Sequence, residues 1–168
     1  MDITFNVKKF SNCNEPDSEI LKQLPMLIRR KLSNLDKLAL TNILKVYDEG
    51  IENVVFSSQY GEFERLFKLI EQHKSENEVS PIQFSSSVHN YLTGVLSLSK
   101  NITVPYYAVS AGEKSFENGL ITAAVSKKTT LFCYTDTLKT PQSFACIITP
   151  EPVYTLKNFN EFLESLND

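Results

Sequence analysis

The segment over residues 104–121 constrains the fold more than any other part of the chain. It opens with apolar residues that predict a short buried strand and passes through the small residues Ser-Ala-Gly112. It then places Phe116 and Leu120 at helical spacing. Gly112 allows a tight strand-to-helix turn with positive φ. A strand that runs through a sharp turn into a helix is a building unit of layered α/β folds.

The rest of the chain alternates short apolar runs with helical patterns. The apolar runs predict five strands, at about 3–7, 53–57, 103–109, 129–135 and 143–149. The order β-αα-β-α-α-β-α-β-β-α predicts one three-layer α/β domain over residues 1–168, with a mainly parallel sheet of about five strands. The last two strands can form a hairpin, which would make the sheet mixed.

Several helices have distinct apolar faces. Four residues at i, i+3, i+4 and i+7 give the cleanest helical period in the chain: Phe63, Leu66, Phe67 and Ile70. Ala and Gly on one face of the helix at about 113–126 would allow close packing. The terminal helix, predicted over 156–166, is expected to turn four apolar residues inward: Phe159, Phe162, Leu163 and Leu166.

The composition is that of an ordinary globular protein and shows no pattern for binding nucleic acid or spanning a membrane. The chain is 42% hydrophobic and 22% charged, with a net charge of −3. Its densest basic run, Arg29-Arg30-Lys31, lies in a helix-like segment and predicts a solvated helix face rather than a nucleic-acid patch. No apolar run approaches the ~20 residues of a membrane span, and the N-terminus lacks a signal-peptide pattern. We therefore expect a cytoplasmic protein.

The cysteines and histidines do not form a metal-binding pattern. Cys13, Cys133 and Cys146 include no CxxC pair, and His73 and His89 are the two histidines of the sequence. A structural zinc site needs four such ligands at close spacing, so we expect neither a metal nor a cofactor. Cys133 and Cys146 lie in strand-like apolar runs and are predicted to be buried, unreactive thiols. The odd cysteine count favours a reducing compartment.

Three segments and Gly94 together resemble the β-ketoacyl-synthase-like N-terminal family. The segments are Val54-Val-Phe-Ser-Ser-Gln-Tyr-Gly61-Glu, Ser80-Pro-Ile-Gln-Phe-Ser-Ser-Ser-Val-His-Asn90 and Ser110-Ala-Gly-Glu-Lys-Ser-Phe116. Members of this family are similar to the first half of ketosynthases and chain-length factors. The resemblance implies a thiolase-like half-fold. Some members are associated with aryl-polyene and other polyketide-like lipid pathways.

The resemblance implies a site architecture without its nucleophile. A ketosynthase carries a Thr-Ala-Cys elbow, where the helix dipole lowers the pKa of the thiol and favours the anion. Aligning Ser110-Ala111-Gly112 on that elbow places Gly112 at the nucleophile position, and glycine cannot form an acyl thioester. The family's further catalytic residues, two histidines or a histidine and an asparagine, belong to the second half of the fold. A chain of this length is not expected to contain that half, so we predict no catalytic residue.

His89 and two serines are the other candidates for catalysis in the sequence. His89 could act as a general base, but it has no cysteine to activate, so a structural or interface role is expected; His73 is predicted to be solvated. Ser110 and Ser115 flank the turn, but a serine elbow needs Gly-x-Ser-x-Gly with a later histidine and acid. No histidine follows His89.

The turn itself is expected to contact an acyl group or a partner. The residues of this degenerate elbow are Ser110, Ala111, Gly112, Glu113 and Ser115. Backbone amides at the start of the following helix could bind an anion or a carbonyl oxygen.

The functional prediction is association rather than catalysis. The resemblance implies a non-catalytic, chain-length-factor-like protein that supports fatty-acid or polyketide-type, aryl-polyene-like lipid biosynthesis. Its partner would be a ketosynthase subunit, an acyl carrier protein or a second copy in a homodimer. The alternatives are a small acyl-binding or acyl-transfer enzyme using Ser110 or Ser115, and a vestigial thiolase-fold scaffold.

A half-fold leaves an apolar face that another subunit, a second copy or the terminal helix must cover. In the thiolase-like arrangement the strand before the elbow lies near the dimer interface. Six residues on and near this strand are predicted to contribute to a protein contact: Val88, His89, Asn90, Tyr91, Tyr106 and Tyr107. In the alternative arrangement one of the two strand tyrosines faces the core and the other faces water. Pro105 restricts this strand to a sheet edge or makes it the start of a strand.

Overall fold

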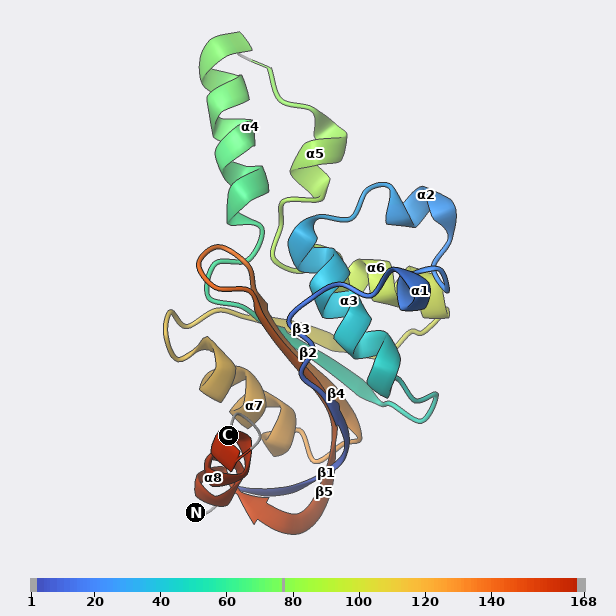
Figure 1. The fold of residues 1–168 in the computed structure, drawn as a ribbon, viewed down its shortest axis with the longest axis vertical. Coiled ribbons are helices and arrows are strands. Elements are labelled where there is room, and N and C mark those ends of the chain that lie inside the picture. Colours follow the sequence, from blue (N-terminus) through green and yellow to red (C-terminus); the bar gives the residue numbers. More distant parts are fainter. Residues whose placement is uncertain (1–2, 77, 166–168) are drawn as a thin grey trace.

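A mixed five-stranded sheet lies between two layers of helices (Figure 1), in a computed structural model that describes residues 3–76 and 78–165. Its strands, in the order β1-β5-β4-β2-β3 across the sheet, are β1 (Thr4–Ser11), β5 (Gln142–Thr155), β4 (Thr130–Asp136), β2 (Asn53–Ser57) and β3 (Tyr106–Val109). β2 pairs in parallel with β3 and β4, and β5 is antiparallel to β4 and β1. Four of the five strands thus point the same way, which confirms the predicted sheet and its terminal hairpin.

One face of the sheet is covered by α3 (Asn34–Val46) and α6 (Tyr91–Lys100), and α1 (Ser18–Leu21) and α2 (Met26–Arg29) add side chains to the same apolar cluster. Leu40 and Ile43 of α3 are buried in the same cluster as Leu131 of β4 and Ile147 of β5. α3 begins with a capping box, in which Ser33 accepts a hydrogen bond from the Asp36 backbone and the Asp36 side chain accepts one from the Ser33 backbone.

The other face is covered by α7 (Ser115–Val125) and α8 (Leu156–Ser165). Phe159 of α8 is fully buried and meets Phe5 edge-to-face at 5.2 Å between ring centroids. Leu163 packs against the same cluster, whereas Leu166 and the Phe162 side chain lie outside the described residues. The terminal helix therefore covers part of the apolar face that a half-fold was expected to leave exposed.

α7 lies unusually close to the sheet at Gly119. A Cβ atom there would fall 2.5 Å from the Ser57 hydroxyl oxygen and 2.8 Å from a ring carbon of Phe132. This contact confirms the predicted close packing of the helix.

Cys133 and Cys146 lie in the same sheet and are fully buried, as expected, and burial raises the pKa of the Cys133 thiol to about 12.

β3 begins three residues later than predicted, directly after Pro105. Proline has no backbone N–H to donate, although the Pro105 carbonyl accepts a hydrogen bond of 3.0 Å from the Val54 backbone. β3 is also an edge strand of the sheet, which is the position that proline tolerates.

Within the described ranges, no helix has the length and apolarity that a membrane crossing requires.

α4 (Phe63–Glu76) and α5 (Pro81–Ser85) stand away from the sheet as a pair, here called the helical arm (Figure 1). The predicted amphipathic helix is present, but the described residues leave its apolar stripe uncovered. The four members of the stripe are 45–54% exposed: Phe63, Leu66, Phe67 and Ile70. Leu69 is the buried residue of α4.

A buried ionic cluster fixes the foot of the helical arm to α3. Arg65 lies 3.4 Å from a carboxylate oxygen of both Asp36 and Glu62, and the Ser33 hydroxyl donates to Glu62 at 2.6 Å. Burial raises the pKa of both carboxyl groups. It raises that of Glu62 to about 7, with the neighbouring Asp36 charge adding to the effect. One arginine therefore faces two acids that do not both ionise readily.

Replacing Gly119 by alanine should lower the free energy of unfolding by about 1–3 kcal/mol, because the added methyl overpacks the contact with Ser57 and Phe132. The matched control is Gly94→Ala in α6, where a Cβ meets nothing within 4 Å. That change should stabilise by up to ~1 kcal/mol through helix propensity. Urea unfolding measures both, and equal effects of the two variants would contradict the packing argument.

The free energy of unfolding should fall as pH rises from about 4.5 to about 7, since the raised pKa of Glu62 means that the folded state holds a proton that the unfolded chain has lost. Glu62→Gln should remove most of this fall, on the order of 1–3 kcal/mol between pH 5 and 8. Urea unfolding across this range is the measurement. Glu71→Gln, on the exposed side of the same helix, should leave the slope unchanged. An unchanged slope in Glu62→Gln would show that the cluster does not hold the proton.

Candidate functional site

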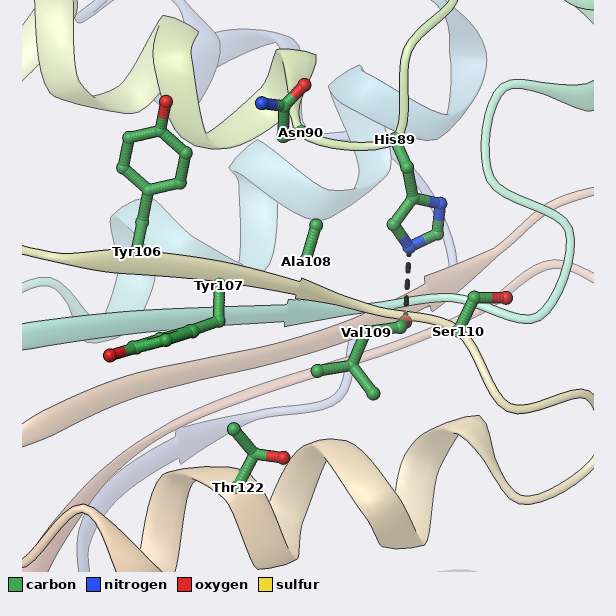
Figure 2. Close-up of a pocket in the computed structure, with 8 residues that line it drawn as sticks. All are labelled: His89, Asn90, Tyr106, Tyr107, Ala108, Val109, Ser110 and Thr122. Atoms are coloured by element: carbon green, nitrogen blue, oxygen red, sulfur yellow. Dashed lines mark hydrogen bonds between the residues drawn. The ribbon is translucent and has the colours of Figure 1, made fainter.

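The carboxyl ends of the three parallel strands meet at one edge of the sheet, where α/β proteins commonly bind ligands. Beside β3 lies an open hollow of about 590 Å³ (Figure 2). Eight residues line it: His89, Asn90, Tyr106, Tyr107, Ala108, Val109, Ser110 and Thr122. The hollow brings together five of the residues singled out from the sequence, which come from the turn before α6, from β3 and from the elbow.

β3 carries its two tyrosines on an open edge. Tyr106 points toward α6 and Tyr107 points toward α7, on opposite sides of the strand (Figure 2). Their side chains are 44% and 51% exposed, so neither faces the core. The alternative with one buried tyrosine is therefore wrong. β3 pairs with β2 on one side, and among the described residues no strand pairs with its other side.

His89 connects the loop after β2 to the end of β3. Its Nε2 lies 3.1 Å from the Val109 carbonyl oxygen, which can only accept, so Nε2 donates (Figure 2). The ring also lies against Gly61, where a Cβ would fall 2.6 Å from Nδ1, and 5.5 Å from the Phe56 ring. Gly61 has φ +54°, so both its backbone conformation and the imidazole beside it exclude a side chain. These contacts hold the imidazole between the loop after β2 and the end of β3.

Gly112 occupies the elbow between β3 and α7. Its φ is +60°, and a Cβ built there would meet nothing within 4 Å. The glycine is therefore required by the backbone conformation and not by crowding. The position is exposed, so the elbow presents a bare backbone turn at its surface.

The Ser115 hydroxyl closes this turn. It accepts a hydrogen bond of 2.9 Å from the Ala111 backbone and donates one of 2.7 Å to the Gly112 carbonyl. The side chain is fully buried, so it is not presented to a substrate. The backbone N–H groups of Lys114 and Ser115 also donate within the turn, which differs from the expectation of free amides at this helix start.

Ser110 is exposed, and no base of the described residues hydrogen-bonds to its hydroxyl. Its hydroxyl is 3.4 Å from the Gln59 carbonyl oxygen and turns away from the His89 ring (Figure 2). The imidazole is bonded to Val109 instead. Ala111 and Glu113 are exposed on the elbow but do not line the hollow. Among the described residues, no three His, Cys, Asp or Glu side chains cluster as metal ligands would.

The turn before α6 divides between surface and core. Val88 and Asn90 are exposed, whereas Tyr91 is partly buried under the Arg65 guanidinium, 5.5 Å from the ring centroid. Val88, His89 and Asn90 can therefore take part in a contact beside β3, while Tyr91 mainly packs against the ionic cluster.

Asp136 organises this end of the sheet, and sequence reasoning missed it. It accepts hydrogen bonds of 2.6 Å from the Ser58 hydroxyl and of 2.9 and 3.0 Å from the backbones of Gln59 and Tyr60. Ser58 in turn accepts one of 2.7 Å from Gly61. The sequence did contain a signal for this site, because Ser58 directly follows the predicted strand at 53–57 and Asp136 directly follows the one at 129–135. These hydrogen bonds tie the loop after β2 to the end of β4.

Two solved structures with a similar fold come from ketosynthase and chain-length-factor proteins. One is the ketosynthase ApeO in complex with its chain length factor ApeC from Xenorhabdus doucetiae, with a TM-score of 0.74, 21% identity, and 89% of this chain and 80% of that chain covered. Another is the ishigamide ketosynthase/chain length factor, with a TM-score of 0.64, 15% identity and 77% of this chain covered. This chain spans 47% of that second protein.

Comparison with curated proteins finds no significant match. Residues 7–156 match the family described as the β-ketoacyl synthase N-terminal domain. That match covers nearly the whole chain and agrees with the fold of the solved neighbours. The chain belongs to the family of β-ketoacyl synthase N-terminal domains.

Proposed function

We propose that this chain is a non-catalytic, chain-length-factor-like subunit that supports a ketosynthase partner. The observation that carries the proposal is that an uncovered edge strand, β3, leads directly into an elbow that holds Gly112. We assign the pathway class as fatty-acid or polyketide-type, aryl-polyene-like lipid biosynthesis, from the family resemblance.

The elbow supports the non-catalytic part of the proposal. Acyl transfer to the protein needs a nucleophile and a base within hydrogen-bond reach. Gly112 supplies no nucleophile, Ser115 is buried within the turn, and His89 is bonded to a backbone carbonyl. A surface that binds without reacting fits these contacts best.

The edge of β3 supports the association. An uncovered strand presents unpaired N–H and C=O groups, which another chain can satisfy by adding a strand. Tyr106 and Tyr107 flank this edge, and tyrosine is enriched at protein contacts because it buries area and keeps a polar hydroxyl. A ketosynthase subunit is the partner we favour, with an acyl carrier protein and a second copy as the alternatives.

The solved structures with a similar fold support the choice of a ketosynthase as the partner. The similar chain from Xenorhabdus doucetiae comes from a ketosynthase complexed with its chain length factor. Because the alignment covers 89% of this chain and 80% of that one, the two are of comparable length. A chain of this size can therefore belong to such a complex.

The chain should co-purify with a full-length ketosynthase of the same genome, and Tyr106→Ala and Tyr107→Ala should each weaken binding about tenfold through lost buried area. Sedimentation or calorimetric titration measures this. Val153→Ala, at an exposed apolar position of β5, is the matched control and should leave affinity unchanged. A strictly monomeric chain that binds no ketosynthase, with tyrosine variants that change only stability, would favour the scaffold alternative.

The isolated chain should form no β-ketoacyl product from malonyl- and acyl-carrier-protein substrates, as measured by mass spectrometry. Gly112→Cys should not create activity, because the described structure places no free base beside the elbow. A side chain at φ +60° should also lower stability by about 1–2 kcal/mol. Turnover by the original chain that is lost in Ser110→Ala would instead support the acyl-transfer alternative.

A further inference from the structure

The helical arm has an apolar face that nothing in the described chain covers. α4 is a helix of 14 residues, a length at which isolated helices are marginal in water. Such helices gain most of their stability by packing an amphipathic face against other structure. Apart from Leu69, however, α4 leaves its apolar residues exposed, and Phe63 and Phe67 stack on each other at the surface. Ile82 and Phe84 of α5 are exposed as well.

A groove of about 430 Å³ lies at the foot of this arm, between α2 and α6. Two of its apolar side chains are largely exposed, Leu27 at 72% and Leu98 at 81%. Gly94 lines the groove from α6, with no atom within 4 Å of where its Cβ would be. The groove is therefore an open apolar concavity with room for an inserted side chain.

The groove joins the arm to the edge of β3. Ser85, at the end of α5, lines one side of it, and Val88 follows from the turn before α6. Asn90 and Tyr106 line both this groove and the hollow beside β3. The end of α5, the groove and the β3 edge are thus consecutive parts of one surface, and α4 packs beside α5.

The charges of the arm argue against a charged partner. α4 carries three cations (Arg65, Lys68 and Lys74) and three anions (Glu64, Glu71 and Glu76). A balanced set offers no basic field for an anionic lipid surface or for a strongly acidic protein. An apolar stripe with a mixed polar rim is instead the composition of a protein–protein interface.

We infer that the helical arm and the groove at its foot dock the same ketosynthase subunit that pairs with β3. This inference rests on the proposed function. It extends the proposed contact from the edge of β3 to the groove and the helical arm. The ketosynthase supplies apolar side chains to the groove and covers the stripe of α4. The docking surface then consists of the helical arm (α4 and α5) and the groove between α2 and α6, and the partner contacts both.

The test measures the affinity of the full chain for a full-length ketosynthase, chosen as the protein of the same genome most similar to the ApeO subunit of the solved complex. Phe67→Gln removes apolar area from the stripe and should weaken binding about tenfold. Gly94→Phe fills the groove from a helical site where the added Cβ has space, and it should weaken binding by about tenfold or more.

Two matched controls separate docking from folding. Lys68→Gln, the neighbour of Phe67 on the polar side of α4, should change affinity by less than about twofold. Gly94→Ala leaves the groove open and should also bind within about twofold of the original chain. The urea midpoint of each variant is recorded, so that a loss of binding without a loss of stability is assigned to the surface.

The outcomes distinguish this inference from the function on which it rests. Binding by the original chain that is weakened in Phe67→Gln and Gly94→Phe but not in the controls supports both. Binding that is lost in Tyr107→Ala but unchanged in Phe67→Gln and Gly94→Phe overturns the docking surface and leaves the proposed function standing. If the original chain binds no ketosynthase, both fail. A concentration-dependent dimer that Phe67→Gln dissociates would then assign the surface to a second copy.

Discussion

The close approach of α7 to the sheet at Gly119 is the contact on which the elbow depends. With no side chain at this position, the helix lies directly against Ser57 of β2 and Phe132 of β4. The start of the same helix is thereby brought to the end of β3, where the chain must turn within a few residues. Gly112 makes that turn with a positive φ, and the Ser115 hydroxyl closes it. Packing in the middle of α7 thus fixes the backbone at its beginning.

The polar groups at this end of the sheet are used to hold loops rather than to react. Asp136 binds the loop after β2, Ser58 binds Gly61, and His89 binds the end of β3. Each of these side chains resembles a catalytic candidate by residue type. Their hydrogen bonds are directed to backbone groups or to one another, and they hold the loops at this end of the sheet in place. The two tyrosines of β3 and the elbow after it remain accessible at the surface.

Some apolar surfaces of this domain are covered by its own helices, and others are exposed. The central strands are covered on both faces, and α8 covers the sheet beside β1 and β5 through Phe159. The edge of β3 and the groove between α2 and α6 share Asn90 and Tyr106 and remain exposed, and the stripe of α4 is exposed as well. Exposed large apolar residues that gather in this way are typical of proteins that function within a complex.

The sequence by itself determined the layered α/β fold, the order of its strands and helices, and the glycine at the elbow. Apolar periodicity and turn residues are local signals, and they located Gly112, α4 and the edge role of the strand after Pro105. The exposed tyrosines and the turn at His89 were also named from the sequence. Only the tertiary structure decided where apolar faces were covered. The stripe of Phe63, Leu66, Phe67 and Ile70 has the same pattern as a core helix, yet α4 stands away from the sheet. Asp136 was missed for the same reason, since its partners are more than 70 residues away in the chain and meet it only after strand pairing.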